Sequence, residues 1–244
     1  MRFVSLVPSL TELLFLLGLD EQVVGITRFC VHPKKKIRGI TRIGGTKTIK
    51  IDKTIDLTPD LVIANKEENS KNDIELLSQK CNVWVTEIIN LNDVYAVILE
   101  LGLRTKTAKK AQDLIANIKL GFYSLHNLLP ELKVLYVIWN APIMVAGHET
   151  FINSILKELH WINILPLEAI RYPVLSAEKV LELAPEYILL SSEPYPFKEN
   201  HLVQYKNQFP NSNVILVDGE MFSWYGSRLL LAPSYFKTLI NSML

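Results

Sequence analysis

Two short loops of this sequence carry carboxylates beside polar or aromatic side chains, and each loop follows an apolar run. Residues 67–69 read Glu-Glu-Asn after the run 61–64, and residues 193–195 read Glu-Pro-Tyr after the run 187–190. The carboxylates Glu67, Glu68 and Glu193 are candidates either for metal ligands or for hydrogen-bond acceptors. Hydrated surface acids are the plain alternative, and the similar placement of the two loops leaves a functional role and this alternative equally open.

The remaining residues with reactive chemistry give a weaker signal. His32 and His148 are the histidines best placed to bind a metal, but they lack the HxH or HExxH spacing of a dedicated zinc site. Either imidazole could instead be an axial ligand to a metal that a chelate already holds. No GxSxG, P-loop or GxGxxG motif joins a strand to a helix, which argues against an enzyme. Cys30 and Cys81 are expected to be free thiols.

The two acidic loops belong to an internal repeat. Residues 52–67 align without gaps with residues 178–193, an offset of 178 − 52 = 126. Identical residues or like charges occur at Asp52/Glu178, Lys53/Lys179, Asp56/Glu182, Leu57/Leu183, Pro59/Pro185, Asp60/Glu186 and Glu67/Glu193. Each copy predicts a short helix, a proline turn, a buried strand and an acidic loop. Ligands of open α/β sheets bind beyond the carboxyl ends of the strands, so the repeat predicts two equivalent rims.

Strand and helix patterns alternate along most of the chain, which is typical of parallel α/β architecture. Ser9 and Glu12 have the spacing of a capping box at the first helix. The expected strands span residues 3–7, 23–27, 61–64, 83–85, 133–138, 187–190 and 214–217. The expected helices span residues 9–18, 72–80, 91–101, 151–159 and 177–183, with a last helix from about residue 228.

A single long helix is expected between the two strand-bearing halves. Apolar residues recur at spacings of three and four through residues 105–128, at Ala108, Ala111, Ile115, Ile118, Phe122 and Leu125. About 24 helical residues with a rise of about 1.5 Å would span about 36 Å. We therefore expect two α/β lobes with mainly parallel sheets, over residues 1–104 and 130–244, joined by one rigid helix over residues 105–129.

Composition excludes several classes of protein. The 244 residues are 49% hydrophobic and 21% charged with a net charge of +1, which is ordinary for a folded globular chain. No basic stripe with interleaved aromatics is present, so nucleic acid is not an expected partner. The apolar stretch 13–19 is far shorter than the ~20 residues of a spanning helix, so membrane insertion is not expected. We expect a monomer.

The start of the chain is expected to be the first strand and helix of the fold. Pro8, Ser9 and Glu12 interrupt the apolar region that a signal peptide would need, and no small-residue cleavage site follows. The expected location is therefore periplasmic or otherwise extracytoplasmic if a leader was removed, and cytoplasmic if none existed.

Six segments, taken in order, resemble one known family. They read SLVPSLTELLFLLG, VVGITRFCVHP, IGGTKTIKID, LTPDLVIANKEEN, SSEPYPF and VDGEMFSWYGSR, and together they extend over nearly the whole chain. They are similar to the helical-backbone receptors for metal chelates, the class III substrate-binding proteins of ABC uptake systems. The similarity is greatest to the cobalamin-binding branch. One departure is His160-Trp161, where many relatives have a glycine or another small residue.

This resemblance implies a ligand held in a cleft between two lobes that close little, with no chemistry done on the ligand and no covalent cofactor. It also implies a partner, the ABC permease. In uptake members an acid on each lobe docks on permease arginines, and the matching positions here are Asp52 and Glu178, the first pair of the repeat.

A corrin or similar chelate is broad and partly apolar with polar edges, so its site should combine aromatic walls with a few polar groups. Arg28 and Arg228 could meet ligand carboxylates or phosphate, although Arg228 could equally pair with an acid of its own lobe. For Trp139 and Trp224, packing in the core is the alternative, whereas Tyr195 and Phe197 favour a rim contact. The full set of expected ligand contacts is Ser9, Arg28, Glu67, Glu68, Trp139, His148, Glu193, Tyr195, Trp224, Tyr225 and Arg228.

The function expected from these features is binding of a metal chelate, corrinoid-like or else a siderophore or haem, for ABC-type uptake. One alternative is a chelatase-like enzyme that inserts a metal into a tetrapyrrole, with His148 and either Glu67 or Glu193 handling protons and metal. A second alternative is a receptor for bare zinc or manganese.

Overall fold

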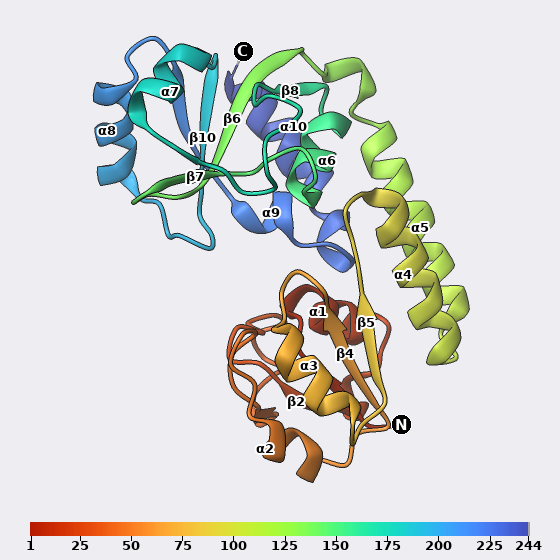
Figure 1. The fold of residues 1–244 in the computed structure, drawn as a ribbon. Coiled ribbons are helices and arrows are strands. Elements are labelled where there is room, and N and C mark those ends of the chain that lie inside the picture. Colours follow the sequence, from red (N-terminus) through yellow and green to blue (C-terminus); the bar gives the residue numbers. More distant parts are fainter. Residues whose placement is uncertain (244) are drawn as a thin grey trace. The chain divides into compact units, whose positions relative to one another are not determined.

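The computed structural model describes residues 1–243, and the chain forms two compact units (Figure 1). The first unit contains Met1–Ile88, Asn92–Asn117 and the short segment Tyr225–Leu230. The second unit contains Ile89–Leu91, Ile118–Trp224 and the chain from Leu231 onward. The sequence therefore returns once to the first unit near its end, a feature that the linear division into lobe, helix and lobe did not include. The boundaries of that division stay a prediction.

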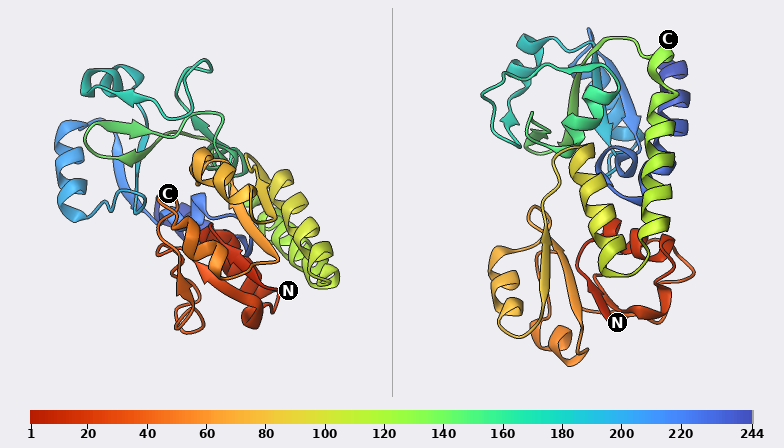
Figure 2. Two further views of the ribbon diagram at one scale, coloured as in Figure 1. Left: turned by 60° about the horizontal axis from the view of Figure 1, so that its bottom comes forward. Right: turned by 90° about the vertical axis from the view of Figure 1, so that its right-hand side faces the viewer.

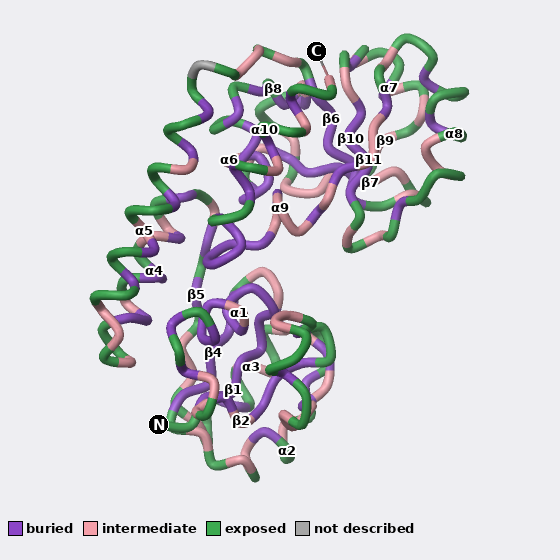
Figure 3. The backbone as a smooth tube through the Cα atoms, turned by 180° about the vertical axis from the view of Figure 1, so that it is seen from behind, coloured by how far each residue is buried: buried purple, intermediate pink, exposed green. Residues whose placement is uncertain are grey.

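The first unit is built on a five-stranded sheet in which all neighbouring strands are parallel, in the order β3-β2-β1-β4-β5. The strands are β1 Phe3–Ser5, β2 Val23–Ile26, β3 Thr41–Arg42, β4 Leu61–Asn65 and β5 Val83–Thr86. Apolar residues of β1 and β4 are buried throughout, as expected for parallel strands covered on both faces (Figure 3).

The first helix begins two residues earlier than the capping box predicted, because the N-cap is Val7 and not Ser9. Helix α1 runs Pro8–Leu16, with Val7 as the N-cap and no side-chain cap. Proline fits the first helical position because its φ is preset and its missing N–H would be unpaired there, so Ser9 lies inside the first turn. The capping-box prediction for Ser9 and Glu12 is wrong. The other helical segments before residue 90 are η1 Asp20–Gln22, α2 Ile51–Asp56 and α3 Lys71–Ser78.

The long helix predicted over residues 105–128 is shorter at both ends. Helix α4 runs Leu91–Arg104 and helix α5 runs Ala108–Tyr123, and the two lie side by side in Figure 1 and in the right-hand view of Figure 2. Lys106, at φ 59°, takes the left-handed conformation that ends α4, and Thr107 accepts the first backbone hydrogen bond of α5. After α5 the chain forms the 3-10 turn η2 His126–Leu128. The residues of α5 are divided between the two units.

The second unit is built on a mixed sheet in the order β11-β10-β6-β7-β9, with β8 pairing β6. Its strands are β6 Leu132–Trp139, β7 Ile143–Val145, β8 Trp161–Asn163, β9 Val174–Leu175, β10 Tyr187–Ser191 and β11 Asn213–Val217. Strands β6, β8, β10 and β11 are parallel, whereas β7 is antiparallel to β6 and β9. The expected class, α/β with mainly parallel sheets, is confirmed.

Five α-helices follow α5, namely α6 Phe151–Glu158, α7 Ala177–Leu183, α8 Glu199–Gln208, α9 Gly219–Ser223 and α10 Ala232–Met243, among the described residues. The last helix does not begin near residue 228 as predicted, because the 3-10 turn η3 Ser227–Leu230 precedes it. Helix α8 was not predicted. Its sequence is largely polar and only Tyr205 is buried, so no apolar stripe marks it.

The internal repeat appears in the structure at the predicted offset. Strands β4 and β10 begin at Leu61 and Tyr187, an offset of 187 − 61 = 126, and each lies beside the first strand of its sheet. In the turn before each strand, a non-glycine residue takes a left-handed backbone conformation: Thr58 at φ 44° and Ala184 at φ 46°. These positions again differ by 184 − 58 = 126, so the turn geometry is repeated as well as the sequence.

One conserved charge of the repeat has a structural role in both copies. Asp60 accepts a hydrogen bond from the backbone N–H of Arg2 at 2.7 Å, and Glu186 accepts one from the backbone N–H of Lys133 at 2.8 Å. Arg2 precedes β1 and Lys133 lies near the start of β6. Each carboxylate therefore ties the amino end of the repeated strand to that of its central neighbour.

Candidate functional site

The acidic loop of the first unit is held by two asparagines. Asn65 ends β4, and its side-chain oxygen accepts the backbone N–H groups of Glu67 at 2.9 Å and Glu68 at 3.2 Å. Asn69 accepts the N–H of Asn65 at 2.8 Å and donates to the carbonyl of Thr46 at 3.1 Å. This network fixes the backbone at the carboxyl end of β4, where the sequence predicted a rim. We call residues 65–69, with Ser9 and Tyr225, the first rim.

Ser9, Glu68 and Tyr225 come together although they are far apart in the sequence. The buried phenol of Tyr225 donates to a carboxylate oxygen of Glu68 at 2.7 Å. Burial, followed by the negative charge of Glu68, raises the pKa of Tyr225 well above its ordinary value, and the Ser9 hydroxyl acts in the opposite direction. The phenol is therefore a stable donor, and it fixes the position of one of the candidate acids.

Two basic residues lie beside the acidic loop or the neighbouring turn. Lys47 donates to the carbonyl oxygens of Glu67 at 2.6 Å and Asn69 at 3.3 Å, a contact that sequence reasoning missed. Arg28 is exposed, with its guanidinium 4.8 Å from the centre of the Phe29 ring. Phe29, which was also missed, is 47% exposed and gives this unit an accessible aromatic face.

Arg228 pairs with Glu12, an acid of the same structural unit. The division expected from the sequence places these two residues in different lobes, 130–244 and 1–104, so this partner was not among the predicted alternatives. Arg228 Nη2 donates to Glu12 Oε1 at 2.9 Å, and the two side chains are 8% and 18% exposed. Gly226, at φ 87°, lets the backbone pass close to Leu13, 3.4 Å from where a Cβ would lie. The segment 225–230 is thus fastened to α1, and a ligand contact by Arg228 stays a prediction.

The acidic loop of the second unit is held from Ser191, the last residue of β10. Its hydroxyl donates to the Glu193 carbonyl at 2.6 Å, and Glu193 Oε1 accepts from the Ser223 hydroxyl at 2.6 Å. Burial raises the pKa of Glu193, and the hydrogen bonds from Ser223 and the Trp224 side chain oppose that rise. Gly219 packs so closely here that a Cβ would lie 2.6 Å from Glu193 Cγ, which explains a glycine at this position.

An aromatic group stands beside this loop. Trp139, the last residue of β6, is 41% exposed, and its ring lies edge-on to Tyr195 with centroids 5.4 Å apart. We call Glu193, Tyr195 and Trp139, with Asn140 and Trp224, the second rim. Core packing is therefore wrong for Trp139. Trp224 is 8% exposed, and Phe197 is buried against Tyr195 and Tyr205, so both rings are largely packed in the interior. A ligand contact by either residue stays a prediction.

His148, one of the two candidate histidine ligands, has hydrogen-bond partners within its own unit. The Nε2 atom of His148 lies 2.8 Å from the Leu165 carbonyl oxygen, and the His148 carbonyl accepts from Asn153 at 2.9 Å. His32 is half-buried. Within residues 1–243 as described, no group of three or more histidine, cysteine, aspartate or glutamate side chains could hold a metal ion. Cys30 and Cys81 are free thiols, as predicted.

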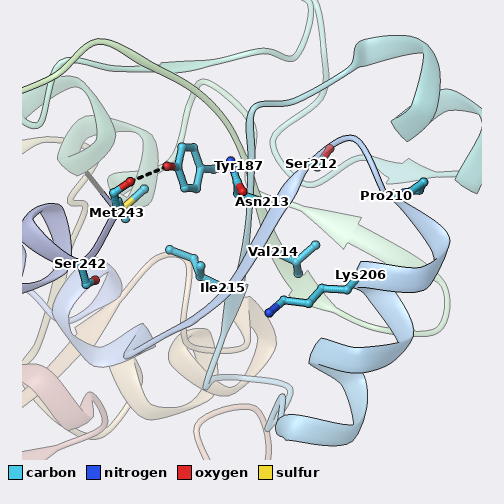
Figure 4. A pocket seen from close by; sticks show the side chains of 9 residues that line it. All are labelled: Tyr187, Lys206, Pro210, Ser212, Asn213, Val214, Ile215, Ser242 and Met243. Atoms are coloured by element: carbon cyan, nitrogen blue, oxygen red, sulfur yellow. Dashed lines mark hydrogen bonds between the residues drawn. The ribbon is translucent and has the colours of Figure 1, made fainter.

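A surface pocket of about 410 Å³ in the second unit lies away from this rim (Figure 4). Tyr187 and Asn213, the first residues of β10 and β11, line it, and Tyr187 donates to the Met243 carbonyl at 2.9 Å. The acidic loop follows the opposite, carboxyl end of β10. The pocket is therefore separate from the candidate site.

The acids predicted to dock on a permease occupy matching positions. Asp52 and Glu178 both lie in the first turn of a repeated helix, α2 and α7, and both are exposed. The hydrogen bond from Ser176, which caps α7, lowers the pKa of Glu178. No helix in the described part of the chain is both long and apolar enough to cross a membrane.

Residues 4–208 match the periplasmic binding protein family, and the chain belongs to it. A vitamin B12-binding protein from Vibrio parahaemolyticus is 24% identical over 213 residues, 86% of this chain and 77% of that protein. The ABC transporter substrate-binding lipoprotein YvrC from Bacillus subtilis is 26% identical over 201 residues, 77% of this chain and 62% of the lipoprotein. The matched part thus spans less than two thirds of YvrC.

The fold is also similar to solved structures of this type. A periplasmic haem-binding protein from Pseudomonas aeruginosa superposes with a TM-score of 0.84 at 18% identity, covering 98% of this chain and 92% of the other. The family and these relatives are substrate-binding proteins rather than enzymes, which confirms the resemblance seen in the sequence and contradicts the chelatase alternative.

Proposed function

We propose that this protein binds a metal chelate with a broad apolar face, a corrinoid or a haem, outside the cytoplasm. The observation that carries the proposal is the exposed Trp139 indole at the carboxyl end of β6, beside the polar group Tyr195. An indole left 41% exposed at a ligand-binding edge offers a flat apolar surface for a ring system. Relatives named for vitamin B12 and haem are consistent with this ligand class.

The polar groups suit the periphery of such a ligand. Corrinoids carry amides and haem carries carboxylates at the ring edge, and both can meet hydrogen-bond donors or cations. In the first unit, the exposed Arg28 and the first turn of α1 around Ser9 offer a cation and backbone N–H groups.

Titration of cyanocobalamin, cobinamide, haemin and a ferric siderophore tests the proposal by isothermal calorimetry. We expect at least one chelate to bind with 1:1 stoichiometry and Trp139→Ala to weaken it about tenfold or more, because exposed aromatic anchors dominate such contacts. Trp84→Phe is the matched control, since Trp84 lies within β5 and faces Arg104. Absence of binding by all four chelates at high micromolar concentration would show that this ligand class is wrong.

We further propose that Asp52 and Glu178 dock on an ABC permease. Both are exposed and stand at equivalent positions of α2 and α7. The double variant Asp52→Ala/Glu178→Ala should bind chelate normally but lose stimulation of ATP hydrolysis by a reconstituted permease. The acids one turn later, Asp56 and Glu182, are also exposed, and their double alanine variant is the control. Equal stimulation by both double variants would contradict the docking role.

A further inference from the structure

His201 lies beside the second rim and contacts Tyr195 in a way that fixes where protons can be. His201 is in the first turn of α8, and its Nδ1 accepts the backbone N–H of Lys198 at 3.0 Å. A backbone N–H can only donate, so Nδ1 must carry a lone pair. In the neutral ring the proton then sits on Nε2, an assignment that follows from the hydrogen-bond network.

The protonated Nε2 faces the phenol oxygen of Tyr195 at 3.0 Å. Because Nε2–H donates, the phenol oxygen accepts. The amide nitrogen of Asn140 approaches the same oxygen at 3.5 Å and also donates to it. Both neighbours therefore supply protons to the oxygen, and neither accepts the phenol's own proton.

We infer that Tyr195 is the hydrogen-bond donor of the second rim, that it donates to a carbonyl or carboxylate oxygen on the ligand, and that His201 is the residue that positions it. The inference rests on the proposed function for the ligand. The phenol is half-exposed and adjoins the exposed Trp139 ring, 5.4 Å between centroids. A ring system lying on the indole thus brings its polar edge to the hydroxyl.

The packing around Tyr195 supports a fixed donor. Its ring contacts Phe197 with centroids 4.8 Å apart and His201 with centroids 5.3 Å apart, both edge-on. Pro194 and Pro196 flank it in the sequence and restrict the backbone. A donor held in one orientation loses little freedom when a ligand binds, so its hydrogen bond contributes more of its strength to affinity.

The proton arrangement can be measured without a ligand. In protein labelled with ¹⁵N-histidine at pH 8, long-range ¹H–¹⁵N spectra report which ring nitrogen carries the proton. We expect the His201 signals, identified by their loss in His201→Asn, to show the Nε2–H form. The Nδ1–H form would overturn the inference, because Tyr195 would then have to donate to His201.

Binding of cyanocobalamin and haemin then tests the donor, and the two probes distinguish amide carbonyl from carboxylate acceptors. Tyr195→Phe should weaken the probe that binds by about 2- to 12-fold, the range of one net hydrogen bond. His201→Asn, which keeps a side-chain acceptor near the Lys198 N–H, should weaken it less. The double variant should match Tyr195→Phe alone, because His201 acts only through Tyr195.

Tyr205→Phe is the matched control, since the buried Tyr205 hydroxyl has no hydrogen-bond partner among the described residues and its ring packs on Phe197. It should leave binding unchanged. Wild-type affinity in Tyr195→Phe, or a His201→Asn effect that persists in the Tyr195→Phe background, would overturn the inference. If neither probe nor any other chelate binds the wild-type protein, the proposed function fails, and the ¹⁵N spectra still decide the proton arrangement.

Discussion

Asn65 and Ser191 stand at equivalent positions, 191 − 65 = 126 residues apart, and each ends the repeated strand of its unit. Asn65 accepts two backbone N–H groups of its acidic loop, whereas Ser191 donates to the backbone carbonyl of Glu193. Beyond these residues the rims diverge. Glu68 accepts from Tyr225, while Glu193 accepts from Ser223 beside an exposed Trp139. The two copies of the repeat thus share a loop anchored from the last residue of the strand, whereas the side chains around the two loops differ.

The segment 225–230 returns to the first unit and pairs Arg228 with Glu12. Breaking this ion pair should lower the free energy of unfolding more than any other change proposed below. Arg228→Met leaves Glu12 as a poorly solvated, unpaired carboxylate and should destabilise the protein by about 3–5 kcal/mol. Urea denaturation followed by circular dichroism measures this loss. Glu12→Leu/Arg228→Met should recover much of it, because no charge is then left unpaired. A loss below about 1 kcal/mol in the single variant would contradict the assigned role.

The hydrogen bond between Tyr225 and Glu68 should contribute less. Tyr225→Phe should cost about 1–2 kcal/mol, and Tyr123→Phe, at a residue 72% exposed, should cost almost nothing. Because the pKa of Tyr225 is raised, the folded state keeps this proton while the unfolded state loses it. Wild-type stability should therefore fall as pH rises above about 10, more steeply than that of the variant. Parallel pH profiles would contradict this.

The repeated turns should respond alike to glycine. Thr58 and Ala184 hold left-handed φ values of 44° and 46°, which cost a side-chain-bearing residue about 1 kcal/mol or slightly more. Thr58→Gly and Ala184→Gly should each stabilise the protein by up to about 1 kcal/mol in thermal melts. Ala116→Gly, at an exposed position inside α5, should destabilise by about as much. If one turn variant stabilised the protein and the other destabilised it, the left-handed conformation would not carry the same energetic cost in the two units.

The smallest change in stability is expected for Glu193→Gln. The raised pKa of Glu193 means that the folded state binds a proton more tightly than the unfolded chain does. The associated stability is present below the ordinary glutamate value of 4.5 and is lost as pH rises through the folded pKa. Glu193→Gln should remove that loss, so that stability relative to wild type increases between pH 4 and 7 by less than about 1 kcal/mol. A constant difference over this range would contradict the prediction.

Local sequence patterns predicted the repeated elements well because each is specified within a few residues. Pro59 and Pro185 mark the turns, and the apolar runs after them can only be buried. Tertiary partners were less accessible. The contact of Arg228 with Glu12 joins residues 216 apart, which the division expected from the sequence places in different lobes. The exposed Trp139 and the buried Phe197 are both aromatic residues near a strand end, and only packing distinguishes them.

Two residues that hold the acidic loops could have been predicted from the sequence. Asn65 and Ser191 are polar residues ending apolar strands at the repeat offset, which is unusual enough to suggest a loop anchor. His201 gave none, since α8 has no apolar periodicity and its contact with Tyr195 depends on how the helix begins. A residue that positions another side chain can be identified only when the structure shows which side chain it contacts.

Because residues 225–230 return to α1, the first unit is built from segments that are not contiguous in the sequence. A fragment ending at residue 104 would be synthesised without the phenol for Glu68 and without the guanidinium for Glu12. Dissection of the coding sequence at that point should yield a poorly folded polypeptide. A synthetic peptide that includes residues 225–230, added in trans, is the natural complement to such a fragment.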